Sequence, residues 1–102
     1  MYYIYIIKCE GDLLYTGITT DVDRRMDEHF GRTTKCAKFT RSHKLLSLEA
    51  LWSCSDRSLA SKLEYRIKQL TKAQKLRLIA DNACFSELFG TENTELYCRE
   101  II

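Results

Sequence analysis

The sequence predicts an α+β fold in which a small three-stranded antiparallel sheet is flanked by about three helices. Two observations indicate the sheet: tyrosine and isoleucine alternate near the start of the chain, and residues 45–54 form another strongly apolar run. A third observation indicates helices, because apolar residues recur every three or four positions over residues 57–70. A chain of 102 residues, 45% hydrophobic and 29% charged, is expected to form one globular domain.

The first two strands are expected to form a hairpin. Residues 1–9 are apolar on both alternating faces, which favours a central strand over an edge strand. Residues 10–12 supply the turn, and residues 13–17 return as the second strand. Gly17 ends that strand and lacks a side chain, so another backbone or a ligand can approach closely there.

A helix is predicted next, reaching about residue 30 and ended by Gly31. At its start Thr20 and Asp23 resemble a capping box with aspartate in place of glutamate. Apolar residues four positions apart predict its buried stripe, which consists of Val22, Met26 and Phe30.

Arg25 and His29 lie one helical turn apart beside that stripe, so both are expected to be semi-buried. Arg24 and Glu28 fall nearer the solvent. A structural role is the alternative for each semi-buried residue. Arg25 could cover apolar surface with its stem, and His29 could be favoured by the helix dipole.

Residues 45–54 predict the third strand, and Ser55 and Asp56 offer caps for a second helix over residues 57–70. Glu64 lies at the edge of that helix's apolar stripe, which consists of Leu59, Leu63, Ile67 and Leu70. Thr71 is expected to cap a third helix over residues 72–80, with Leu76 and Ile79 facing inward.

The charge is unevenly distributed. The net charge is +2, but residues 81–102 hold five acids against Arg99, a net of −4, which leaves +6 for residues 1–80. Between residues 24 and 44 only Asp27 and Glu28 oppose a basic cluster of Arg24, Arg25, Arg32, Lys35, Lys38, Arg41 and Lys44. Such a concentration of positive charge is suited to binding a polyanion such as nucleic acid. The alternative is that these residues form an ordinary charged loop exposed to solvent.

Five cysteines in no CxxC arrangement, with no secretory signal, indicate reduced thiols and a cytoplasmic protein. No apolar run approaches the roughly 18 residues of a membrane-spanning helix, so no membrane partner is expected.

Several separated motifs together resemble the GIY-YIG nuclease superfamily, and most closely its small stand-alone members. The resemblance covers residues 1 to about 81 and rests on Tyr3-Ile4-Tyr5, Tyr15-Thr16-Gly17, Arg25, His29 and Glu64. It implies a nuclease domain over residues 1–81. Residues 82–102 would then be an acidic and apolar C-terminal extension, docked on the same domain.

The resemblance also implies site residues. The catalytic set would be Tyr5, Tyr15, Arg25, His29 and Glu64, and Glu64 would be the metal ligand. Two positions depart from the family pattern, since Tyr3 stands where GIY has glycine and Thr16 replaces the isoleucine of YIG. Asn82 is a weak match for an asparagine that some members carry.

Phosphodiester hydrolysis needs residues of these types. One carboxylate suits Mg²⁺ (or Mn²⁺), which keeps several waters and takes further oxygens from the substrate. Arg25 can bind phosphate oxygens bidentately. Tyr5 is the first choice for the base, assisted by Tyr15 or His29. Because tyrosine has a pKa near 10, neighbouring cations or the metal would have to depress it.

The residues expected to hold the DNA backbone are Arg24, Arg32, Lys35, Lys38, Arg41 and Lys68. Structural alternatives exist here too. Tyr5 and Tyr15 could be cross-strand neighbours, and Glu64 and Lys68 a surface ion pair.

The sequence therefore predicts a metal-dependent endonuclease acting on branched, nicked or otherwise distorted DNA in repair or recombination. One alternative is a nucleic-acid-binding module with weak or no catalysis, and another is a protein-interaction domain. The oligomeric state stays open, and the apolar tail would permit a homodimer.

Overall fold

The structure is a computed structural model that describes residues 1–31 and 43–102. Its first two strands, β1 (Tyr2–Cys9) and β2 (Leu13–Thr19), form the predicted hairpin. Gly11 and Asp12 make the turn with positive φ angles of 84° and 59°, a conformation that glycine and aspartate tolerate best.

The sheet has four strands rather than the predicted three. Strand β3 (Leu45–Cys54) pairs antiparallel with β1, and the short β4 (Cys98–Arg99) pairs with the end of β3. The order is β2-β1-β3-β4, so β1 is central, as the apolar character of both its faces predicts. The sequence gives no sign of β4 because two residues are too few to establish an alternating pattern.

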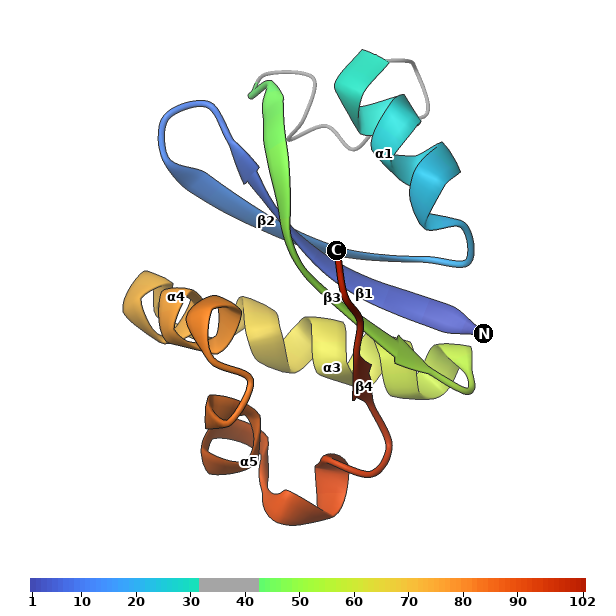
Figure 1. The fold of residues 1–102 in the computed structure, drawn as a ribbon, viewed down its shortest axis with the longest axis vertical. Helices are drawn as coiled ribbons and strands as arrows, with labels where there is room; N and C mark the ends of the chain where they lie inside the picture. Colours follow the sequence, from blue (N-terminus) through green and yellow to red (C-terminus); the bar gives the residue numbers. More distant parts are fainter. Residues whose placement is uncertain (32–42) are drawn as a thin grey trace.

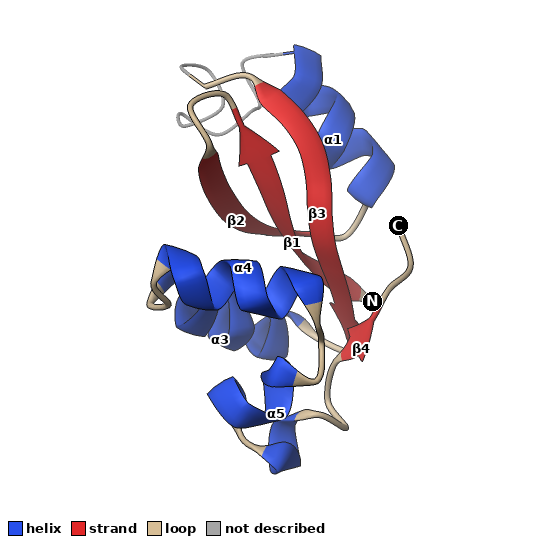
Figure 2. Cartoon of the chain, turned by 60° about the vertical axis from the view of Figure 1, so that its left-hand side comes forward, coloured by secondary structure: helices blue, strands red, loops and turns tan. Residues whose placement is uncertain are grey.

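Four α-helices lie in the described part of the chain, one more than the sequence predicts: α1 (Val22–Gly31), α3 (Arg57–Lys68), α4 (Lys72–Ala80) and α5 (Cys84–Phe89). A short 3₁₀ helix, η1 (Thr91–Asn93), follows α5. Helix α1 lies against one face of the sheet, and the other helices lie on the opposite side (Figure 1, Figure 2).

Each face of the sheet therefore has its own apolar cluster. The larger one places Trp52 of β3 and Ile4 and Ile6 of β1 against α3, α4 and α5. The smaller one packs Tyr5, Ile7 and Cys9 of β1 against Val22 and Met26 of α1. Because β1 contributes side chains to both clusters, it fixes α1 and α3 relative to one another.

Some predicted details are wrong. Phe30 is 64% exposed, and His29 is instead the fully buried residue of α1. In α4 it is Leu78 that is buried, while Leu76 is 47% exposed. The periodicity predicts a helix but leaves open which of two neighbouring faces the sheet covers.

The start of α1 also differs from the prediction. The Asp21 carboxylate accepts a hydrogen bond from the backbone N–H of Arg24 at 3.1 Å, so Asp21 caps the helix, and not Thr20. Helix α3 is capped by Asp56, and α4 by Thr71 in a full capping box with Gln74. Within the described residues, no helix is long and apolar enough to cross a membrane.

Candidate active site

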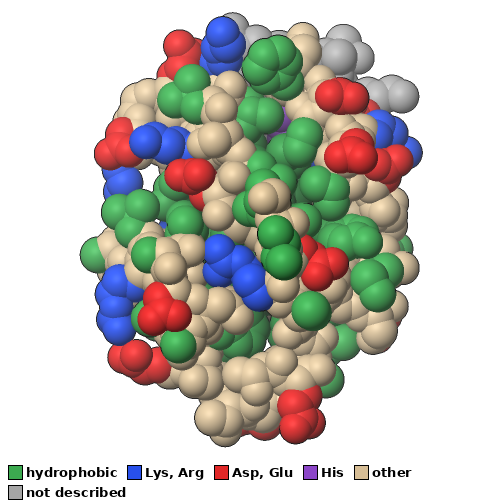
Figure 3. Space-filling model, in the orientation of Figure 1, with side chains coloured by type: hydrophobic (Ala, Val, Ile, Leu, Met, Phe, Trp, Pro, Cys, Tyr) green, Lys and Arg blue, Asp and Glu red, His purple; other side chains and the backbone are tan. Residues whose placement is uncertain are grey.

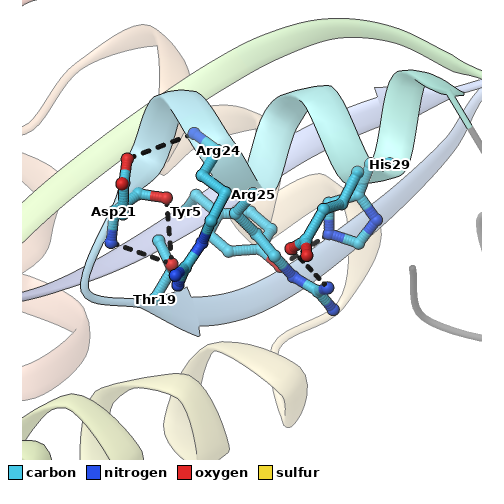
Figure 4. Close-up of polar contacts among 7 residues, drawn as sticks. Tyr5, Thr19, Asp21, Arg24, Arg25 and His29 are labelled. Carbon is cyan, nitrogen blue, oxygen red and sulfur yellow. Dashed lines mark hydrogen bonds and ion pairs between the residues drawn. The ribbon is translucent and has the colours of Figure 1, made fainter. Parts of the chain in front are cut away.

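The candidate site is built around Tyr5, whose side chain projects from the central strand toward α1. Tyr5 is 1% exposed, and its hydroxyl lies 2.8 Å from Nε2 of the fully buried His29. The guanidinium of Arg25 donates a hydrogen bond to the same hydroxyl through Nε at 3.4 Å. Figure 4 shows Arg25 and His29 extending from one helix to meet the Tyr5 ring.

The directions of these hydrogen bonds follow from the donors available. A guanidinium can only donate, so the Tyr5 oxygen accepts from Arg25 and its own O–H remains to donate to His29. Nε2 of His29 accepts that bond in the tautomer of the neutral ring that carries its proton on Nδ1. Burial and the charge of Arg25 lower the pKa of His29 to about 4, which is consistent with a neutral ring at physiological pH.

The pKa of Tyr5 is raised, whereas the sequence argument expects it to be lowered. Burial raises the pKa of Tyr5 to about 12, and the hydrogen bond and charge of Arg25 offset only part of that rise. Tyr15 and Glu64 raise the pKa of Tyr5 further through their charges. In this state Tyr5 is a protonated hydrogen-bond donor, whereas the sequence argument requires a depressed pKa.

Gly17 provides the space that Tyr5 occupies. It pairs directly opposite Tyr5 in the hairpin, and a Cβ atom built on Gly17 would lie only 2.5 Å from Cζ of the Tyr5 ring. The close approach predicted at Gly17 is therefore made by the Tyr5 side chain, and not by another backbone or a ligand.

Glu28 is part of the site although the sequence argument placed it toward solvent. Its carboxylate lies 3.3 Å from Nη1 of Arg25, and both side chains are mostly buried, at 17% and 21% exposed. The i,i+3 spacing of Arg25 and Glu28 was the available signal for this ion pair. Glu28 holds the guanidinium in place and balances its charge.

Tyr15 links this cluster to α3. Its ring packs edge-on against His29, with ring centres 5.9 Å apart. On its other side, Nζ of Lys68 lies 5.6 Å from the centre of the Tyr15 ring and 3.6 Å from the Glu64 carboxylate. The structure thus brings together all five predicted catalytic residues, together with Lys68, through consecutive contacts.

Glu64 has the chemistry of a ligand for a hard divalent cation. Its side chain is 25% exposed and carries carboxylate oxygens, which Mg²⁺ prefers. No group of three or more His, Cys, Asp or Glu side chains placed to hold a metal occurs in residues 1–31 and 43–102. The donor set therefore fits an ion that keeps most of its waters, and it does not fit a closed zinc site.

The other predicted residues divide into three groups. Arg24 is exposed next to Arg25 on α1. Asn82 accepts a hydrogen bond from Trp52 Nε1 at 2.9 Å in the larger cluster, where it supports the core and does not join the site. The rest of the basic set lies outside the described residues: Arg32, Lys35, Lys38 and Arg41.

Charges of both signs are interspersed over the face of the molecule shown in Figure 3, and apolar side chains occupy its centre. The described side chains form no extended basic surface on this face.

Comparison with known proteins places this site in a family. A model of the GIY-YIG catalytic domain matches residues 1–77, the segment that holds Tyr5, Tyr15, Arg25, His29 and Glu64. The UPF0213 protein YhbQ of Escherichia coli O8 (strain IAI1) is 47% identical over 93 residues, which cover 91% of each chain. YhbQ of Escherichia coli O1:K1 is 46% identical over the same coverage.

Among solved structures, a solution NMR structure of a UPF0213 protein from Bacillus halodurans is 36% identical. The match covers 78% of this chain and 84% of that one, with a TM-score of 0.46. Because the family model matches most of the chain and the curated relatives cover 91% of it, the chain belongs to the GIY-YIG family, among its small stand-alone members.

Proposed function

We propose that this protein is a metal-dependent endonuclease that hydrolyses DNA phosphodiester bonds. The observation that carries the proposal is the hydrogen-bonded group of Tyr5, His29 and Arg25, to which the partly exposed Glu64 is linked through Lys68 and Tyr15. The group combines a proton acceptor, a fixed cation and a ligand for a divalent metal, which are the three needs of phosphodiester hydrolysis.

The proton acceptor would be the pair of Tyr5 and His29. As water attacks phosphorus, its proton passes to the Tyr5 oxygen while the Tyr5 proton passes to Nε2 of His29. This transfer is unfavourable without substrate, because the pKa of His29 is about 4 and that of Tyr5 about 12. A phosphate at Arg25 would offset the positive charge that lowers the pKa of His29, and so would make His29 a better acceptor.

Arg25 would bind the phosphate whose charge increases during attack. Its guanidinium is already fixed by Tyr5 and Glu28, so little reorganisation is needed when the phosphate arrives. An incoming phosphodiester would compete with Glu28 for the same donors, and Arg25 would bind it more strongly as its negative charge increases during attack.

Glu64 would hold one Mg²⁺ or Mn²⁺ ion, which when bound would neutralise charge on the phosphate and on the departing oxygen. Lys68 would hold the Glu64 carboxylate on the Tyr15 side of the site through the ion pair between them. It could also contact phosphate, together with Arg24 and the predicted basic residues that follow α1.

The proposed substrate is branched, nicked or otherwise distorted DNA in repair or recombination. Support for this choice comes from the roles of the family. The basic set expected to contact the backbone offers phosphate contacts that hold DNA without reading its sequence.

The test is single-turnover cleavage of labelled duplex, nicked, flapped and four-way DNA with Mg²⁺, with Mn²⁺ and with chelator. Wild type is compared with Glu64→Ala and with Glu95→Ala, a matched loss of one exposed carboxylate away from the site. Cleavage that is lost with chelator and with Glu64→Ala, but kept with Glu95→Ala, supports the proposal. Equal cleavage by all three proteins would contradict the role of Glu64.

A second candidate, a nucleic-acid-binding module with weak or no turnover, is favoured by the burial of Tyr5. Its ring is 1% exposed and its pKa is raised to about 12, both of which hinder its use as a base. Salt-sensitive DNA binding that is identical with and without metal, with no cleavage of any substrate, would identify this function.

A further inference from the structure

A cavity lies on the flank of α3 opposite to Glu64. It has a volume of about 320 Å³ and lies between α3 and the C-terminal segment that contains α5 and η1. Lys62 and Arg66 line it, and each is two residues from Glu64, which at 3.6 residues per turn places them on the other side of the helix. We call this cavity the extension pocket; it is bounded by Leu63, Tyr65, Arg66, Phe89, Asn93 and Leu96, with Lys62 at its edge.

The wall of the extension pocket combines apolar, aromatic and basic side chains. Its lining includes two cations, Lys62 and Arg66, and no acidic side chain. Lys62 and the hydroxyl of Tyr65 make no hydrogen bond or ion pair within the described residues, and the Tyr65 side chain is 66% exposed. These groups are therefore available to a ligand, and their charge complements an anion.

The inner part of the extension pocket is held by contacts within the protein. The Arg66 guanidinium lies 5.2 Å from the centre of the Phe89 ring and donates to the Phe89 carbonyl at 3.4 Å. Asn93 donates through Nδ2 to the same carbonyl at 2.6 Å, which fixes the plane of its amide. Its carbonyl oxygen makes no hydrogen bond in the described part of the chain, and so can accept one from a ligand.

The size and the chemical groups of the extension pocket suit a single nucleotide. The volume lies at the lower end of the range of about 300–1,000 Å³ typical of small-ligand sites, which is too small for a folded partner. Aromatic rings that stack bases, an amide that bonds base edges and cations that bind phosphate are the groups that recognise unpaired nucleotides. A base within a duplex could not enter, because its edges are paired and its faces are stacked.

We propose that the extension pocket binds one unpaired nucleotide of the DNA that the active site cuts. The proposal rests on the proposed nuclease function. The pocket and Glu64 are separated by the width of α3, about 10–12 Å, or about three nucleotides at the 3.4 Å rise of one strand. A bound unpaired nucleotide would thus direct cleavage to DNA with a flap, a gap or a bulge.

The location of the pocket supports a role specific to chains with this extension. The catalytic-domain model ends at residue 77, whereas Phe89, Asn93 and Leu96 all come from beyond it. Orange segments below α3 in Figure 1 mark this part of the chain. The extension would therefore add substrate selection to the common catalytic core.

Binding is tested by NMR titration of the full chain in chelator with a 5′-phosphorylated single-stranded trinucleotide, and separately with inorganic phosphate. Amide shifts centred on Tyr65, Asn93 and Leu96 are expected with the trinucleotide. Leu96→Trp, which fills the pocket, should weaken this binding about tenfold. Leu76→Trp is the matched control, because Leu76 is similarly exposed on α4 and does not line the pocket.

Cleavage provides the second readout. Leu96→Trp should lower cutting of flapped DNA relative to nicked duplex about tenfold, while Leu76→Trp leaves the ratio unchanged. Trinucleotide binding with no cleavage by wild type would contradict the nuclease function and support the pocket. Wild-type cleavage with no shifts at the pocket, or with the same ratio in both tryptophan variants, would overturn the pocket proposal alone. If inorganic phosphate caused amide shifts at the pocket as large as those caused by the trinucleotide, the pocket proposal would also be overturned, because no base would then be recognised.

Discussion

At the scale of single residues, the site depends on polar groups that satisfy one another away from water. A buried hydroxyl or imidazole costs free energy unless it is hydrogen-bonded, and Tyr5 and His29 meet this need in one 2.8 Å contact. The neutral form of His29 is thereby built into the folded state, which couples folding to pH.

His29 makes stability fall in acid. The unfolded chain binds a proton at His29 below about pH 6.5, whereas the folded protein keeps His29 neutral down to about pH 4. Between these values unfolding takes up a proton, so the free energy of unfolding decreases as the pH falls from 6.5 toward 4, by about 3 kcal/mol in total. Urea unfolding across this range measures it. In His29→Gln, which keeps an acceptor for Tyr5, this part of the pH dependence should disappear; an unchanged slope would contradict the assignment.

Replacing Gly17 should displace Tyr5. In Gly17→Ala the new Cβ would lie 2.5 Å from Cζ of a ring that has no free space around it, because Tyr5 is 1% exposed. We expect a loss of about 1–3 kcal/mol of stability and strongly reduced cleavage. Denaturation of Gly17→Ala, Tyr5→Ala and the double variant forms a cycle. The alanine at position 17 should cost much less in the double variant, and purely additive effects would show that the clash is not the cause.

The two neighbouring arginines of α1 offer a matched pair. Arg25→Ala removes the cation hydrogen-bonded to Tyr5 and should raise the barrier of cleavage by about 2.7–4 kcal/mol, or about 100- to 1,000-fold in rate. Arg24→Ala removes an equal charge from the exposed side of the helix and should weaken DNA binding slightly without changing the single-turnover rate at saturation. Equal effects of the two substitutions on that rate would show that Arg25 acts only as a general positive charge.

At the scale of elements, α1 positions three site residues at once. Arg25, Glu28 and His29 occupy one face of a ten-residue helix, and Val22 and Met26 anchor that helix to the smaller cluster. Small rotations of α1 would therefore move the Tyr5 contacts of both Arg25 and His29. The start of the helix deserves a direct test, because the sequence and the structure differ there.

The cap of α1 can be tested with two aspartates. Asp21→Ala removes the acceptor for the Arg24 N–H and should cost about 0.5–2 kcal/mol of stability. Asp23 is the position favoured by the capping-box interpretation. Asp23→Ala should cost less stability, because it removes only the favourable interaction of an acidic side chain with the first turn of the helix. Thermal unfolding of both variants measures the difference. A larger loss for Asp23→Ala would restore the original interpretation.

The sequence predicts elements better than it predicts their contacts. The hairpin, β3, α3 and α4 follow from local periodicity and capping residues, so their positions are confirmed. Periodicity cannot show whether Phe30 or His29 faces the sheet, since the two are adjacent and the choice depends on how α1 is tilted. Four residues that the family resemblance singles out, Tyr5, Tyr15, Arg25 and His29, are joined by direct contacts, and Glu64 is joined to them through Lys68. Their catalytic roles stay a prediction. The ion pair of Glu28 and the raised pKa of Tyr5 arise from burial, which only the packed structure reveals.

At the scale of the whole molecule, the central strand β1 separates two apolar clusters that differ in their roles. The smaller cluster holds Tyr5 and Tyr15 of the candidate site, while the larger one, which includes Trp52, contains most of the buried apolar residues. The C-terminal segment belongs physically to the larger cluster. Phe85 and Phe89 are 2% and 3% exposed, and the Tyr97 hydroxyl donates to the Leu59 carbonyl of α3 at 2.6 Å.

Removal of residues 82–102 should therefore disrupt the fold although every predicted catalytic residue remains. Trp52 would lose its hydrogen bond to Asn82, its contact with the Phe85 ring and the Arg99 guanidinium 5.1 Å from its own ring centre. Losing one buried phenylalanine side chain typically costs about 3–5 kcal/mol, so losing two would offset most or all of the about 5–15 kcal/mol that stabilises a typical small domain. Fluorescence of Trp52, the single tryptophan, reports the outcome directly. We expect red-shifted emission and no cooperative unfolding transition for the truncated chain, and blue-shifted emission with one transition for the full chain. A cooperative transition in the truncated chain would mean that residues 1–81 fold alone, and the extension would then serve substrate selection without a structural role.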